Sequence, residues 1–88
     1  MTKFGKKEEN PFMLLREQRG LTQREIAQAL DVTDQTISNW ENYRSEPKLT
    51  IGQTLKLCQI LQCSLEELAE IAEQISHQVK SRRQDPNP

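Results

Sequence analysis

The chain has 88 residues, of which 34% are hydrophobic and 28% charged, and its formal net charge is −1 at pH 7. These values are typical of one small soluble domain with a modest core. No apolar run approaches the roughly 18 residues of a membrane span and the N-terminus lacks a signal-peptide segment, so we expect a cytoplasmic protein. The two cysteines are too few for a disulfide framework or a zinc site, and we expect neither metal nor cofactor.

The first nine residues carry three lysines and predict a flexible basic arm, which either contacts phosphate or only aids solubility. Asn10 followed by Pro11 is the pattern of a helix N-cap and its first helical position, and Gly20 is a stop signal. We therefore predict a helix over about residues 11–19. Its expected buried face consists of Phe12, Leu14 and Leu15.

The stretch from residue 22 to residue 42 predicts two short helices joined by a tight turn. Thr22 and Glu25 form a capping box at the start of the first helix, and Thr33 can cap the second. Only residues 30–32 lie between them, which is too short for anything except a sharp turn. The two helices must therefore cross steeply and touch.

The second of these helices, about residues 34–42, has an apolar side and an unusual polar side. Exposed helix positions normally carry Lys, Glu or Arg, but this outer side is rich in amides. An amide presents a donor beside an acceptor, which matches the N6/N7 edge of adenine in a DNA major groove. This pattern predicts a DNA recognition helix. At 100° per residue, Ile37, Trp40 and Glu41 share one side, Gln35, Asn39 and Asn42 lie nearly opposite, and Asp34 and Ser38 flank that outer stripe.

This stretch resembles the helix-turn-helix domains of phage repressors and Cro proteins, the Xre-like family. Asp31 stands where that family usually has Gly in a left-handed conformation, and Asp tolerates φ > 0 at some cost. The resemblance covers about residues 11–70 and implies an all-α, five-helix, repressor-like fold that binds DNA as a dimer. The matching positions are Gln23, Ile26, Ala27, Leu30, Val32, Ile37 and Trp40.

Side-chain chemistry makes Gln35 the best candidate for a base contact, followed by Asn39, with Ser38 able to donate or accept. Asp34 either accepts from a cytosine N4 amino group or stabilises the positive end of its own helix. In the resembling family the loop after the recognition helix follows the DNA backbone. The candidate phosphate contacts are Gln23, Asn42, Arg44, Lys48, Arg16 and Tyr43.

Two of these candidates have an alternative structural role. The resemblance implies that Arg16 pairs with Glu41 and ties two helices together beneath the DNA surface. Part of the guanidinium is then left for a phosphate, or the pair is purely structural. Tyr43 either donates its hydroxyl to a phosphate or covers the core.

Two further capping boxes predict the remaining helices. Thr50 with Gln53 opens a fourth helix that runs to about residue 61, and Ser64 with Glu67 opens a fifth at Leu65. The residues expected to be buried by the fourth helix are Leu55, Cys58 and Leu61.

The fifth helix is longer than a five-helix domain needs, and its apolar residues recur at steps of three and four. Leu65 and Leu68 are expected to complete the core of the monomer. Ala72, Ile75 and Val79 are then predicted to form a homodimer interface, unless the helix packs back on its own domain. The predicted domain therefore covers residues 10–79, and residues 80–88 are predicted to form a flexible tail.

The charge is unevenly distributed along the chain. Four glutamates of the fifth helix follow a more basic N-terminal part, so if this helix faces away from DNA the remaining surface can still be locally positive.

We expect a transcriptional regulator that binds double-stranded DNA sequence-specifically as a dimer, with repression favoured over activation. It would act by occupying a pseudopalindromic operator with half-sites about 34 Å apart. The alternative is a protein-interaction module that lost DNA binding, or an antitoxin whose main partner is a toxin. An enzyme is disfavoured because no nucleophile, base and orienting group occur at a recognisable spacing.

Overall fold

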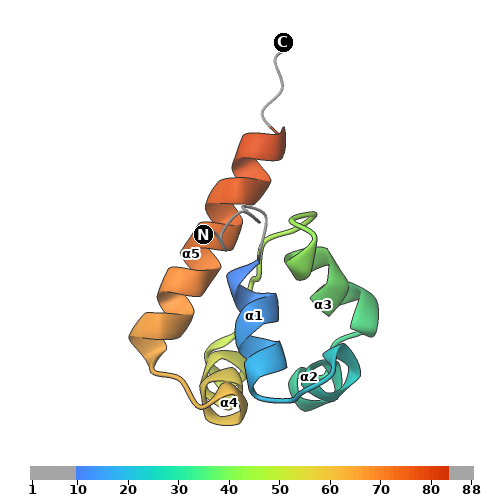
Figure 1. The fold of residues 1–88 in the computed structure, drawn as a ribbon, viewed down its shortest axis with the longest axis vertical. Coiled ribbons are helices and arrows are strands. Elements are labelled where there is room, and N and C mark those ends of the chain that lie inside the picture. The colour runs from blue at the N-terminus through green and yellow to red at the C-terminus, as the bar shows by residue number, and fades with distance from the viewer. Residues whose placement is uncertain (1–9, 84–88) are drawn as a thin grey trace.

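Five α-helices follow one another along the chain, separated by short turns and one longer loop between the third and fourth (Figure 1). The computed structural model describes residues 10–83, and no strand occurs among them. The all-α, five-helix prediction is confirmed. The helices are α1 (Pro11–Gln18), α2 (Gln23–Leu30), α3 (Asp34–Glu41), α4 (Ile51–Leu61) and α5 (Leu65–Arg83).

The two predicted terminal segments have different outcomes. The arm over residues 1–9 lies outside the described residues, and so do residues 84–88 of the predicted tail. Residues 80–83 continue α5, so the tail prediction is wrong for them. The last turn of this helix has a partner in the domain, because the guanidinium of Arg82 lies 5.4 Å from the ring centre of Tyr43.

Side-chain caps begin each of the five helices. Thr22 accepts a hydrogen bond from the backbone N–H of Glu25 at 3.0 Å, and the Glu25 carboxylate accepts from the N–H of Thr22 at 2.8 Å. Each cap of this kind typically stabilises a helix by about 1 kcal/mol. All three predicted capping boxes therefore form, the other two between Thr50 and Gln53 and between Ser64 and Glu67, while Asn10 caps α1 and Thr33 caps α3.

Four of the helices end at a residue with left-handed backbone geometry. In each case the next residue donates its N–H to a carbonyl five residues earlier, which is the Schellman pattern. The prediction that Asp31 adopts φ > 0 is confirmed, and only one of the four positions is a glycine. The φ angles are 70° at Gly20, 61° at Asp31, 58° at Tyr43 and 53° at Gln62.

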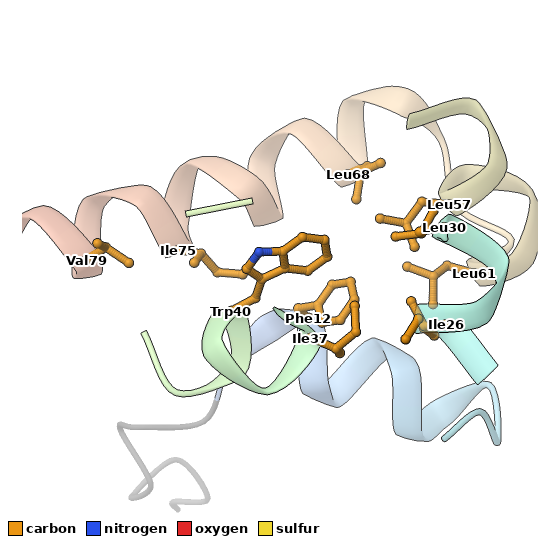
Figure 2. Close-up of a cluster of buried hydrophobic side chains, with 11 residues drawn as sticks. Phe12, Ile26, Leu30, Ile37, Trp40, Leu57, Leu61, Leu68, Ile75 and Val79 are labelled. Atoms are coloured by element: carbon orange, nitrogen blue, oxygen red, sulfur yellow. The ribbon is translucent and has the colours of Figure 1, made fainter. Parts of the chain in front are cut away.

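The core lies where α1, α2 and α3 meet the inner faces of α4 and α5 (Figure 2). Phe12 and Trp40 pack edge to face, with ring centres 5.7 Å apart and planes at 86°. Burying one large apolar side chain contributes about 1.5–3 kcal/mol. The buried set is Phe12, Ile26, Ala27, Leu30, Ile37, Trp40, Leu57, Leu61, Leu68, Ile75 and Val79.

Three leucines that the sequence pattern placed in the core lie largely at the surface, namely Leu14, Leu55 and Leu65. Leu55 is 60% exposed, and Leu57 is buried in its place. α4 carries leucine on both sides, so periodicity alone could not choose between its faces. The contacts of α4 with α2 and α5 decide which face is buried.

α5 packs back on α1 and α4, along the left side of the molecule in Figure 1. Ile75 is 0% exposed and Val79 1% exposed, and both join the core of their own domain, while Ala72 is half-buried. The prediction that Ile75 and Val79 form a dimer interface is therefore wrong, because their side chains have no surface left for a second copy. No helix in the described part of the chain is long and apolar enough to span a membrane.

Candidate nucleic-acid interface

α3 separates its apolar and polar side chains onto opposite faces. Its inner face buries Ile37, Trp40 and Glu41 against the rest of the domain. On the other face Gln35 and Asn42 are exposed and Asn39 is half-buried. The two-sided pattern predicted from the sequence is therefore present in the fold.

Two amides on the outer face of α3 are joined to each other. The Gln35 Nε2 group donates to Asn39 Oδ1 at 2.9 Å, one helical turn away. This bond uses one of the two Nε2 hydrogens and leaves Oε1 open. Gln35 therefore keeps one donor and one acceptor side by side, which is what bidentate contact with adenine requires, and Asn39 restricts its orientation.

Asn42 and Ser38 are engaged with each other at the C-terminal end of the same face. The Asn42 Nδ2 group donates to the Ser38 carbonyl at 2.9 Å and to Ser38 Oγ at 3.2 Å. These bonds occupy the amide donors of Asn42. A phosphate contact through Asn42 would have to replace them.

Polar contacts hold the inner side of α3 against α1. The Asn10 amide donates to the Trp40 carbonyl at 3.1 Å, and the Arg16 guanidinium binds Glu41 through Nε at 2.7 Å and NH2 at 3.1 Å. Hydrogen bonding to Glu41 raises the pKa of Arg16 although burial lowers it, so the guanidinium stays charged. α3 is thereby fixed relative to the rest of the domain.

Gln23 and Arg16, both predicted to contact phosphate, belong to this internal network. Gln23 Nε2 donates to Glu41 Oε1 at 2.8 Å, and Arg16 NH1 donates to the Leu21 carbonyl at 2.8 Å. Arg16 is only 8% exposed. Arg16 therefore makes the contacts expected of a purely structural pair with Glu41. The same carboxylate orients Gln23 at the first helical position of α2.

A family model described as helix-turn-helix matches residues 12–68. The chain belongs to the helix-turn-helix family. No curated protein and no solved structure is similar enough to this chain to count as a match. The matched range runs from α1 to the start of α5, so the Xre-like resemblance predicted over about residues 11–70 is confirmed.

One contact on the outer surface of this helix-turn-helix unit was absent from the sequence prediction. Arg24 NH2 lies 3.5 Å from Asp34 Oδ2 and joins the first turns of α2 and α3. Asp34 therefore has a cationic partner in addition to the positive end of its own helix. The two residues are ten positions apart, and only the steep crossing of the helices brings them together.

The loop that follows α3 presents the other predicted phosphate contacts. Arg44 and Lys48 are exposed, while Tyr43 is half-buried and packs against the core. The loop is tied to α5, because Ser76 Oγ donates to Glu46 Oε1 at 3.1 Å. This anchoring gives the backbone of the loop a defined position beside α3.

The acidic helix of this helix-turn-helix protein lies away from the recognition helix. Figure 1 shows α5 on one side of α1 and α3 on the other. The four glutamates of α5, Glu66, Glu67, Glu70 and Glu73, are all exposed. Arg24, Arg44 and Lys48 can therefore act on the α3 side without direct competition from α5.

Proposed function

We propose that this chain binds double-stranded DNA sequence-specifically as a homodimer and regulates transcription by occupying an operator. Membership of the helix-turn-helix family supports DNA binding. The observation that carries sequence specificity is the outward amide pair, in which Gln35 keeps a donor and an acceptor free beside Asn39. We favour repression, with the protein working in the cytoplasm, where it meets DNA.

The proposed dimer needs an interface other than Ile75 and Val79. Among residues 10–83 the most exposed large apolar side chain is that of Ile51, at 89%, and Leu55 lies one turn further along the same face of α4. Leu55 is 60% exposed. An isologous contact between two copies of this face would bury both residues, and α4 follows directly on the loop after the recognition helix.

The test is selection of bound sequences from a random DNA pool at about 0.15 M salt. We expect an inverted repeat, because two identical subunits related by a two-fold axis contact two half-sites. Gln35→Ala should weaken operator binding by about 1–3 kcal/mol and leave non-specific binding nearly unchanged. The matched control is Gln78→Ala, which removes an exposed amide from α5 and should change neither.

Other outcomes of this selection have definite meanings. Equal losses on operator and non-specific DNA would remove Gln35 from sequence recognition. If the folded protein enriches no sequence, the proposed function fails and a protein partner, such as a toxin, becomes the better explanation. A salt series separates these cases, because DNA affinity falls steeply with ionic strength whereas an apolar protein interface changes little.

A further inference from the structure

The ion pair between Arg24 and Asp34 lies on the outer surface of the two crossing helices. Arg24 occupies the second position of α2, and Asp34 occupies the first position of α3. Their side chains are 70% and 51% exposed. Gln35, the best candidate for a base contact, directly follows Asp34 in α3.

This pair contributes little to the stability of the domain. Ion pairs between exposed side chains typically contribute about 0–1 kcal/mol, and neither residue belongs to the apolar core. The separation of 3.5 Å is also longer than an ordinary N–H···O hydrogen bond. No hydrogen bond within residues 10–83 uses the Arg24 guanidinium, so its N–H donors remain available for a ligand.

We propose that Arg24 contacts a DNA phosphate and that Asp34 is the positioning residue that holds its guanidinium. The inference rests on the proposed function and adds a contact to it. In helix-turn-helix proteins the first helix of the motif crosses the DNA backbone while the second lies in the major groove. A guanidinium on the first turn of α2 therefore meets the backbone, and its planar set of donors matches a phosphate.

This positioning role differs from the two roles that the sequence indicated for Asp34, namely a contact with a cytosine amino group and stabilisation of the N-terminus of α3. A carboxylate near DNA phosphates is unfavourable by itself, but this one faces a cation across the helix crossing. Holding a long side chain near its bound conformation lowers the entropy lost on binding. Only one edge of the guanidinium faces Asp34, so the other edge is open to phosphate.

Salt-dependent binding tests the proposal on the operator recovered by selection and on an unrelated duplex. Arg24→Ala should reduce the slope of log affinity against log salt by about 1.8, because each of the two subunits of the proposed dimer loses one phosphate contact. Affinity should fall by more than about fivefold near 0.15 M salt, equally on both DNAs. The matched control is Lys80→Ala, which removes one positive charge from an exposed position on α5, away from the proposed dimer contact. It should leave the slope close to that of the unchanged protein.

The role of Asp34 is tested by introducing Asp34→Asn into the unchanged protein and into the Arg24→Ala variant. If Asp34 positions Arg24, the loss caused by Arg24→Ala should be at least twofold smaller when Asp34 is already replaced, and base preference should not change. Loss of preference at a single C·G pair, with or without Arg24, would instead make Asp34 a base contact. That result would overturn the positioning role.

Three results would contradict the Arg24 contact. The first is an unchanged salt slope in Arg24→Ala, and the second is an equal change of slope in Lys80→Ala. In either case the operator is still enriched, so the proposed function stands and only this inference fails. The third is failure of the folded protein to enrich any DNA, which overturns both. Matching thermal midpoints of all variants would exclude unfolding as the cause.

Discussion

Glu41 joins α3 to the two helices that precede it. Its side chain is 0% exposed, and it accepts hydrogen bonds from Arg16 and Gln23. A buried carboxylate is tolerated only when cationic and polar groups compensate its lost hydration. Three helices are thus linked through one carboxylate on the inner side of α3.

Replacing Arg16 by Leu should lower the free energy of unfolding by about 3–5 kcal/mol, because Glu41 would be left buried without a cation. The double variant Arg16→Leu/Glu41→Leu should recover most of this loss, since no charge is then buried. Urea denaturation of both variants measures the difference. Equal instability of the single and double variants would show that the fold needs the hydrogen bonds themselves rather than charge compensation.

At the scale of elements, the turn between α2 and α3 determines how the two helices cross. Asp31 ends α2 with φ of 61°, a conformation that costs most L-residues about 1–2 kcal/mol and Asp somewhat less. Its carboxylate also lies at the negative end of the α2 dipole, which is unfavourable. The turn therefore keeps its geometry at some expense of stability.

Asp31→Gly should raise the free energy of unfolding by about 0.5–1 kcal/mol, because glycine adopts φ > 0 without strain. Asp31→Asn should give a smaller gain, since it removes the charge and keeps the side-chain shape. Thermal unfolding of the two variants separates backbone strain from charge. Asp31→Ala is the control and should destabilise, and a destabilised glycine variant would contradict the strain argument.

At the scale of the whole molecule, α5 completes the core instead of extending from it. Ile75 and Val79 are buried in the same cluster as Trp40, next to which Ile75 lies in Figure 2. Of the four exposed large apolar side chains within residues 10–83, two, Ile51 and Leu55, lie one turn apart on the same face of α4, whereas Leu14 and Leu65 lie singly on α1 and α5. A dimer contact is therefore expected on α4, on a different side from the acidic surface of α5.

Two aspartate substitutions test this assignment by sedimentation and thermal unfolding. Ile75→Asp should abolish cooperative folding, because removing a buried aliphatic side chain costs about 2–5 kcal/mol and burying an unpaired charge adds to it. Leu55→Asp should leave the fold intact and convert the proposed dimer to a monomer. A folded monomer from Ile75→Asp would restore the α5 interface, and an unchanged dimer from Leu55→Asp would exclude the α4 face.

The amino-acid sequence by itself determined where helices begin, where α2 turns into α3 and which face of α3 is polar. These features depend on residues three to five positions apart, such as Thr22 with Glu25 or Gln35 with Asn39, whose contacts form within one turn of helix. The left-handed turn at Asp31 was expected from the family resemblance, since the Xre-like family usually has Gly at this position.

Only the tertiary structure decided which side of α4 is buried, that α5 folds back on its own domain, and that Arg24 meets Asp34. Both faces of α4 carry leucine, and the apolar stripe of α5 suits a neighbouring helix of either the same or a second chain. Each choice depends on where helices distant in sequence come to lie. Local patterns carry no information about that position, because it follows from the combined packing of all five helices.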